Sequence, residues 1–174
     1  MDGCCNLVLV GFMGTGKSVI GRRVAALANR PFLDMDAEIE RRSGKSISRI
    51  FAEDGEVVFR DMESALSVEW GKERDHSVIA CGGGIVTREE NLSALGENGI
   101  LVCLKARIEV ILERTSRSGR RPLLDTRDRE QKIRDLLLAR AAAYASLPHQ
   151  IDTSDLDPHV LAQRLLELWE ANMG

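Results

Sequence analysis

Residues 11 to 18 read GFMGTGKS and match the pattern G-x-x-x-x-G-K-[ST] with no position missing. The apolar run NLVLV at 6–10 precedes this stretch and is typical of a buried parallel strand. After it, Ile20, Val24 and Leu27 recur at the three- and four-residue intervals of a helix. Because the motif requires a strand, a glycine loop and a helix in this order, the sequence predicts a phosphate-binding loop rather than a chance glycine-rich turn.

A loop of this kind holds the phosphates of a nucleotide with its backbone N–H groups and with the helix that follows. Gly14 and Gly16 let the backbone approach the ligand closely. Lys17 is expected between the β- and γ-phosphates, and the hydroxyl of Ser18 is expected to coordinate Mg²⁺. The motif alone does not identify the acceptor of the phosphoryl group, so transfer to a molecule, transfer to water and simple binding remain open.

The composition is that of an ordinary soluble protein with one domain, predicted to span 1–174. Apolar residues make up 44% and charged residues 29%, and the net charge is −3 with a pI of about 5.7. This slightly acidic balance gives no reason to expect nucleic acid as a partner. No apolar run approaches the roughly 20 residues that span a bilayer, so we expect no membrane partner. The first residues lack the pattern of a signal peptide, and we therefore expect the cytoplasm.

The four cysteines do not form a metal-binding pattern. Cys4 and Cys5 are adjacent, whereas Cys81 and Cys103 each lie in an apolar run that is typical of a strand. There is no C-x-x-C pair, and neighbouring cysteines do not easily bridge each other. We predict reduced and mostly buried thiols.

Predicted strands alternate with predicted helices along the chain, which indicates a parallel sheet covered on both faces. We therefore predict an α/β fold with three layers, α/β/α, and a central five-stranded parallel sheet. After the first strand and helix, the further strands are predicted at 31–35, 77–81, 99–104 and 148–152. Further helices are predicted at 36–43, 46–54, 55–73, 88–96, 107–116, 128–146 and 157–172.

The stretch SRSGRRPLLDTR at 116–127 fits neither a strand nor a helix. It carries four arginines, one glycine and one proline. Such a segment suits a mobile lid over a binding site, and a solvated surface loop is an equally good interpretation of its composition.

Two carboxylates, Asp34 and Asp36, end the second predicted strand, where ligands gather in open α/β sheets. Alternate residues of a strand share a face, so both side chains are expected to face the nucleotide. Asp36 has the chemistry of a base that accepts the proton of an acceptor hydroxyl. The alternative is that Asp36 caps the helix that follows.

Two arginines are candidate ligands for an anionic acceptor. Arg60 lies in a predicted helix three residues before Glu63, and the alternative for this pair is an ordinary exposed ion pair. Arg140 lies on a predicted apolar helix face, where a guanidinium requires a carboxylate or phosphate partner, either within the protein or on a ligand. That face also carries Ile133, Leu136, Leu137, Ala141 and Tyr144.

Three consecutive glycines, Gly82, Gly83 and Gly84, follow the strand predicted at 77–81. Their bare backbone allows a small molecule to lie against the main chain at the edge where a crevice opens. A simple flexible turn is the alternative for this segment taken by itself.

Together these motifs resemble the shikimate kinase family over nearly the whole chain. The nucleotide motif is shared by many families, whereas D-x-D followed by I-F-x-x-x-G-E-x-x-F-R-x-x-E is much more restrictive. The pieces that carry the resemblance are GFMGTGKS-x-x-G-R-x-x-A at 11–25, the stretch from FLDMD to RDMES at 32–64, GGG at 82–84, RPLL at 121–124 and LLLARAAAY at 136–144.

The resemblance implies a kinase that transfers the ATP γ-phosphoryl group to the 3-hydroxyl of shikimate, with Mg²⁺ as cofactor. It implies an acceptor-binding helical segment at about 34–64 and a lid at about 116–127. The implied catalytic residues are Lys17, Asp36 and Arg121, and the implied metal contacts are Ser18 and Asp34, the latter through water. The implied ATP contacts are Gly14, Thr15, Gly16, Lys17, Ser18, Val19, Arg114 and Arg121, with residues near 152–158 at the adenine. The implied acceptor contacts are Asp36, Arg60, Glu63, Gly82, Gly83, Gly84 and Arg140.

The sequence departs from the usual family pattern at Val19, where many relatives carry threonine, and in the basic run 105–107. Neither departure changes the predicted function. A gluconate kinase or a nucleoside monophosphate kinase of the same architecture remains an alternative, as does a non-catalytic nucleotide-binding regulatory module. The D-x-x-G and N-K-x-D motifs of a GTPase switch are absent from the sequence. We expect a monomer whose partners are ATP and shikimate.

Overall fold

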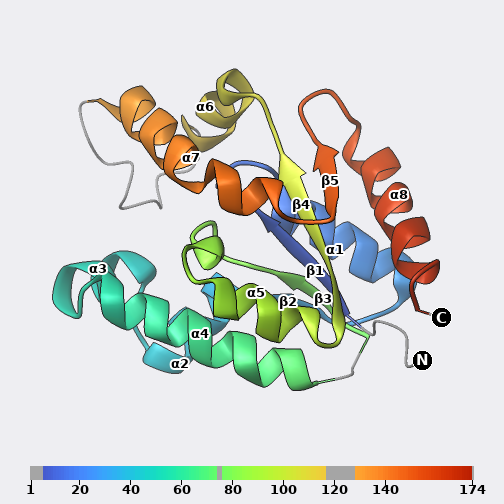
Figure 1. The fold of residues 1–174 in the computed structure, drawn as a ribbon, viewed down its shortest axis with the longest axis horizontal. Helices are drawn as coiled ribbons and strands as arrows, with labels where there is room; N and C mark the ends of the chain where they lie inside the picture. Colours follow the sequence, from blue (N-terminus) through green and yellow to red (C-terminus); the bar gives the residue numbers. More distant parts are fainter. Residues whose placement is uncertain (1–5, 74–75, 117–127, 174) are drawn as a thin grey trace.

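The fold was analysed in a computed structural model that describes residues 6–73, 76–116 and 128–173. Five parallel strands form one sheet in the order β2-β3-β1-β4-β5, as Figure 1 shows. The predicted α/β class and the five-stranded parallel sheet are thus confirmed. The strands are β1 Asn6–Gly11, β2 Phe32–Asp34, β3 Val78–Ala80, β4 Gly99–Lys105 and β5 His149–Asp152.

Helices cover both faces of the sheet, and most of them begin and end within two residues of the predicted bounds (Figure 1). The short helix η1, which follows the three glycines, was not predicted. The helices are α1 Lys17–Ala28, α2 Met35–Ser43, α3 Ile47–Glu53, α4 Glu56–Lys72, η1 Ile85–Thr87, α5 Glu89–Gly96, α6 Ile108–Ser116, α7 Arg129–Ala145 and α8 Pro158–Glu170.

The core has two parts because alternate residues of the central strand point to opposite faces. Leu7 and Leu9 of β1 pack with α1 and α8 on one face. Val8 and Val10 pack on the other face with residues from α2 to α7. All four side chains are fully buried. Helices that bury both faces of a continuous apolar strand form the three predicted layers.

The order of the strands brings their carboxyl ends to one edge of the sheet. The chain leaves β1 toward β2 on one side and later crosses from β3 to β4 on the other side. Ligand crevices open at such a switch point, outside the carboxyl ends of the strands. The segments after β1, β2, β3 and β5 therefore meet there, although they are far apart in the sequence.

Several smaller predictions can be compared with this structure. Cys81 and Cys103 are buried free thiols, as predicted, whereas Cys4 and Cys5 lie outside the described residues. The apolar stripe of α7 is confirmed at Ile133 and Tyr144, but Ala141 is exposed because it lies at the margin of the packed face. The predicted lid extends from the last residue of α6 into 117–127, which lies outside the described residues. Within the described part of the chain, no helix has the length and apolar character needed to cross a membrane.

A pair of matched leucines tests the packing of α8 against the sheet. Leu165 is 0% exposed and Leu138 on α7 is 79% exposed. We expect Leu165→Ala to lower the free energy of unfolding by about 2–5 kcal/mol, because it removes buried methyl groups and leaves a cavity. Leu138→Ala should change it by less than about 0.5 kcal/mol. Urea denaturation measures both, and equal effects would contradict the position of α8 in the core.

Candidate active site

A cavity of about 940 Å³ lies at the carboxyl edge of the sheet. Nearly all residues that the sequence predicted for the site contribute to its wall. Thr15, a residue of the loop itself, is buried and does not line the cavity, and Arg121 lies outside the described residues. The predicted residues in the wall are Gly14, Gly16, Lys17, Ser18, Val19, Asp34, Asp36, Arg60, Glu63, Gly82, Gly83, Gly84, Arg114 and Arg140.

The loop after β1 has the backbone geometry of an anion-binding turn. Gly14 and Gly16 have φ values of 81° and 97°, in the left-handed region that favours glycine. The ammonium group of Lys17 donates to the carbonyl oxygens of Gly11 at 2.7 Å and Phe12 at 2.9 Å. Its positive charge is thereby held at the loop, next to the amino terminus of α1.

Hydrogen bonds from two threonine hydroxyls hold the loop in place. The Thr15 hydroxyl donates to the Phe12 carbonyl at 2.7 Å. The Thr153 hydroxyl donates to the Thr15 carbonyl at 2.9 Å. Arg114 joins the same group, since it donates to the carbonyls of Gly14 and Thr153 at 3.2 and 2.9 Å. Arg114 therefore lies beside the phosphate-binding loop, and its contact with ATP stays a prediction.

Asp34 links the second strand to the loop. Its Oδ2 accepts a hydrogen bond from the Ser18 hydroxyl at 2.7 Å, and its Oδ1 accepts from the backbone N–H of Ala37 at 3.2 Å. Asp34 is thus the cap of α2, and Asp36 lies in the first turn of that helix. The alternative in which Asp36 caps the helix is wrong, because the residue before Met35 already fills that role.

Ser18 and Asp34 supply adjacent hard oxygen atoms of the kind that Mg²⁺ prefers. These two side chains would hold a magnesium ion, which would supply positive charge to a bound phosphate. Among the described residues, no three His, Cys, Asp or Glu side chains form a metal-binding cluster.

Arg60 and Glu63 form a buried ion pair on α4. Their side chains are 8% and 0% exposed, and Arg60 NH1 donates to Glu63 Oε2 at 2.6 Å. The alternative of an ordinary exposed pair is therefore wrong. Burial raises the pKa of Glu63, and the Arg60 charge offsets part of that effect. Burial alone would lower the pKa of Arg60, but its carboxylate partners outweigh this and raise it.

Arg140 of α7 also points into the cavity and is 6% exposed. Its NH1 donates to the Gly83 carbonyl at 3.2 Å, and the Tyr144 hydroxyl donates to the same oxygen at 2.6 Å. Burial raises the pKa of Tyr144 to about 12, so the phenol remains a hydrogen-bond donor at neutral pH. Arg140 thus has an internal hydrogen-bond partner, the Gly83 carbonyl. A hydrogen bond to this neutral group is weaker than one to the carboxylate or phosphate that a buried guanidinium normally receives.

The three glycines form a wall that touches the charged groups directly. A Cβ atom on Gly82 would lie 2.4 Å from Glu63 Oε1 and 2.9 Å from Asp36 Oδ1. The guanidinium of Arg60 occupies the corresponding space at Gly84. Only glycine fits here without movement of these side chains, so the alternative of a merely flexible turn is wrong.

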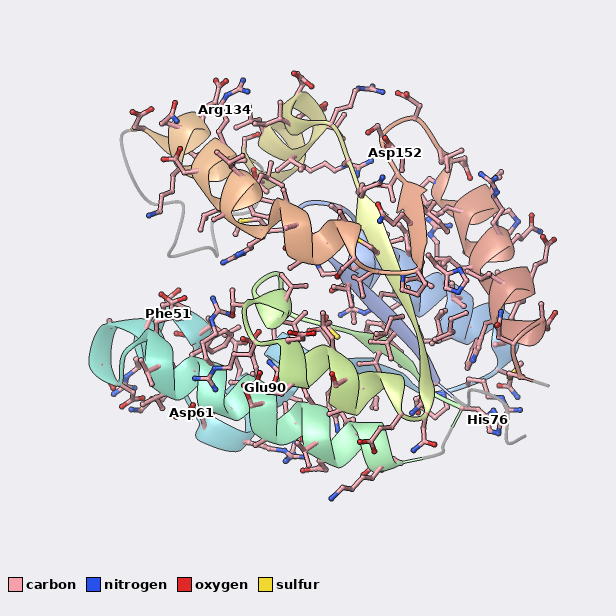
Figure 2. All side chains as sticks on the ribbon, viewed as in Figure 1. Phe51, Asp61, His76, Glu90, Arg134 and Asp152 are labelled. Carbon is pink, nitrogen blue, oxygen red and sulfur yellow. The ribbon has the colours of Figure 1, made fainter. Side chains whose placement is uncertain are left out.

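The apolar part of the wall was largely missed by sequence reasoning. The rings of Phe51 and Phe59 pack in a tilted arrangement, with centroids 4.9 Å apart and an interplanar angle of 45°, and Ile47 also lines the cavity. Figure 2 shows Phe51 on the α3 side of the molecule and Asp152 at the end of β5. The i, i+4 spacing of Ile47 and Phe51 was a possible signal, but that spacing usually marks the core. Leu156 and Pro158 line the part of the cavity formed after β5, within the predicted segment 152–158.

Comparisons with known proteins agree with this geometry. The family model described as "Shikimate kinase" matches residues 13–170. A shikimate kinase of Pelotomaculum thermopropionicum is 44% identical over 151 residues, which are 87% of each chain. A shikimate kinase of Acinetobacter baylyi is 43% identical over 94% of this chain and 91% of its own.

Solved structures give the same result. A shikimate kinase from Acinetobacter baumannii in complex with shikimate has a TM-score of 0.91 and 41% identity, covering 98% of this chain and 96% of its own. A gluconokinase from Sinorhizobium meliloti has a TM-score of 0.58 and 14% identity, covering 98% of this chain and 97% of its own. The second likeness concerns the fold alone.

Substitution of one glycine tests the contact between the wall and the carboxylates. We expect Gly82→Ala to lower the free energy of unfolding by about 1–3 kcal/mol, because the added methyl group overlaps a Glu63 side chain that its ion pair holds in place. The control is Gly96→Ala, where the nearest atom is Leu101 Cδ1 at 3.4 Å, and the expected change is less than about 1 kcal/mol. Chemical denaturation measures both, and a smaller effect at Gly82 than at Gly96 would contradict the close contact.

Proposed function

The chain belongs to the shikimate kinase family, and we propose that its cavity transfers the γ-phosphoryl group of ATP to the 3-hydroxyl of shikimate. The enzyme is an ATP-dependent kinase with a hydroxyl group as acceptor. The observation that carries the proposal is the common cavity, in which a phosphate-binding loop, two buried guanidiniums and a carboxylate meet. The whole chain then acts as one kinase domain.

The acceptor end of the cavity suits a small ring with one carboxylate and several hydroxyl groups. Arg60 and Arg140 are cations that can donate to the carboxylate, and charge-assisted hydrogen bonds of this kind contribute roughly 1.5–3 kcal/mol each. The glycine wall leaves room for the ring against the backbone. Glu63 orients Arg60 through the 2.6 Å ion pair and so supports the acceptor contact.

Asp36 is the proposed base. It lines the cavity together with Lys17, and it lies near both Glu63 and the backbone of Gly82. The acceptor hydroxyl gives its proton to the Asp36 carboxylate while its oxygen forms a bond to the γ-phosphorus. The bond between that phosphorus and the bridging oxygen of ADP breaks at the same time, and the electron pair leaves with ADP.

Lys17 neutralises the negative charge that spreads over the phosphates during transfer. Ser18 and the water-bridged Asp34 are the proposed holders of Mg²⁺, which when bound neutralises phosphate charge and fixes its orientation. Arg114 is proposed on the nucleotide side because it is bonded to the loop and to Thr153. Gly14, Thr15, Gly16 and Val19 complete the proposed ATP contacts. Arg121, outside the described residues, keeps its proposed role at the transferring phosphoryl group.

The competing functions are less well supported. A gluconate kinase or nucleoside monophosphate kinase shares the fold, but the identity to the gluconokinase is 14%, against 41% to the shikimate-bound kinase. A regulatory module without turnover needs neither a base nor a paired acceptor site. Because one chain supplies the described wall of the cavity, a monomer is sufficient for the proposed reaction.

A substrate panel tests the proposal. We expect ADP release with ATP, Mg²⁺ and shikimate, and at most a few per cent of that rate with gluconate or a nucleoside monophosphate. Lys17→Ala is the control, since removal of the loop cation should abolish transfer without unfolding the protein. A preference for another acceptor, or no turnover with any of them, would reject the proposed function.

Asp36→Asn tests the base. The amide keeps the size of the side chain but cannot accept the proton, so kcat should fall by about 10²–10⁴-fold. Asp36 does not cap α2, so the thermal midpoint should change little. Steady-state kinetics and thermal unfolding measure the two effects, and a stability loss with normal kcat would assign Asp36 a structural role.

A further inference from the structure

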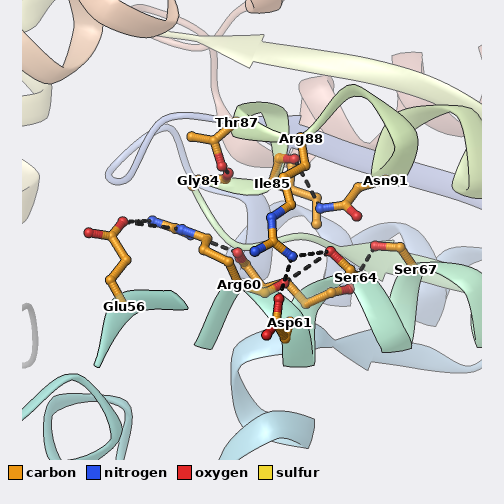
Figure 3. Close-up of polar contacts among 12 residues, drawn as sticks. Glu56, Arg60, Asp61, Ser64, Ser67, Gly84, Ile85, Thr87, Arg88 and Asn91 are labelled. Carbon is orange, nitrogen blue, oxygen red and sulfur yellow. Dashed lines mark hydrogen bonds and ion pairs between the residues drawn. The ribbon is translucent and has the colours of Figure 1, made fainter. Parts of the chain in front are cut away.

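Arg60 has a second carboxylate partner besides Glu63. Its Nε and NH2 both donate to Glu56 Oε1, at 3.2 and 2.9 Å, as the dashed lines of Figure 3 show. NH1 donates to Glu63 at 2.6 Å. The Nε–NH2 edge, which is one of the two edges that bind a carboxylate in a bidentate manner, is thus occupied by a residue of the protein.

The two carboxylates differ in their surroundings. Glu63 is 0% exposed, and its position is fixed between Arg60 and the glycine wall. The Glu56 side chain is 53% exposed and begins the first turn of α4, directly after Gly55. Only the Glu56 partner of this pair is exposed, so Glu56 can turn to the solvent and be hydrated, whereas the buried Glu63 cannot.

The balance of charge at the end of the cavity that holds Arg60 and Arg140 also favours displacement of Glu56 from Arg60. Among the described residues at this end, Arg60 and Arg140 are the cations, and Asp36, Glu56 and Glu63 are three carboxylates near them. An incoming carboxylate would be the fourth anion around two cations if Glu56 stayed in place. If Glu56 turns to the solvent instead, the number of carboxylates remains three and Arg60 keeps two carboxylate partners.

We propose that Glu56 is a specificity-determining residue that occupies the Nε–NH2 edge of Arg60 until the carboxylate of the acceptor displaces it. This inference rests on the proposed function, since it presumes a carboxylate acceptor at Arg60. A ligand with a carboxylate replaces one anion by another and leaves the guanidinium paired. A neutral polyol in that position removes Glu56 without supplying a charge, so the exchange selects for acids.

The inference predicts a result opposite to that of an ordinary binding residue. Removal of a competing carboxylate should tighten acceptor binding, so Glu56→Gln and Glu56→Ala should lower the shikimate KM by about two- to fivefold, the range expected for a pair with an exposed partner. Calorimetric titration with shikimate should show the same decrease in Kd. The ATP KM and kcat should stay within about twofold of the wild type, because Glu56 touches neither the loop nor the reacting atoms.

Asp61→Asn is the matched control. Asp61 lies on the same helix, is 63% exposed and pairs with Arg88 at 2.8 Å, so this change removes one negative charge without touching Arg60 (Figure 3). It should leave the shikimate KM unchanged, which separates the displacement from a general effect of net charge. A shikimate KM that is unchanged or raised in either Glu56 variant overturns the inference. A wild-type enzyme that does not phosphorylate shikimate rejects the proposed function instead.

Discussion

The buried ion pair between Arg60 and Glu63 is the interaction on which the acceptor end of the structure depends. A buried guanidinium is strongly stabilised by an anionic partner, and Glu63, three residues later on α4, supplies it at 2.6 Å. The Glu63 carboxylate is fully buried, and a side chain at the neighbouring position 82 would overlap with it. Gly82 has no side chain and avoids this overlap. The pair thus explains both the charge of the cavity and the glycines of its wall.

The fold contributes by bringing distant segments to one edge. The phosphate loop follows β1, the carboxylates of the nucleotide and acceptor sides follow β2, and the glycine wall follows β3. Arg140 reaches the same place from α7, where its guanidinium meets the Gly83 carbonyl. Each element would be an ordinary strand or helix by itself. The site forms because the strands are parallel, which places all their carboxyl ends at the same edge of the sheet.

Much of this arrangement could be predicted from the sequence, since the apolar runs and the loop motif report local structure directly. The strands, the helices and nearly all charged residues of the cavity lie where the patterns indicated. Features that depend on tertiary packing were harder to predict from the sequence. The choice between Asp34 and Asp36 as the cap of α2 depends on which side chain faces Ala37. The exposure of the Arg60 pair depends on its packing against the glycines at 82 and 84, a contact between distant segments that gives no periodic signal. The role of Phe51 could not be separated from that of a core residue, because both produce the same spacing.

The contact between Thr153 and the Thr15 carbonyl spans 138 positions of the chain. The nucleotide loop is therefore translated well before Thr153, the residue that supports it. Thr153 directly follows β5, which pairs with β4, and β4 pairs with β1, so the contact forms only after β5 has joined the sheet. A nascent chain therefore acquires its finished nucleotide loop only after β5 and Thr153 have emerged, which delays ligand-assisted stabilisation until then.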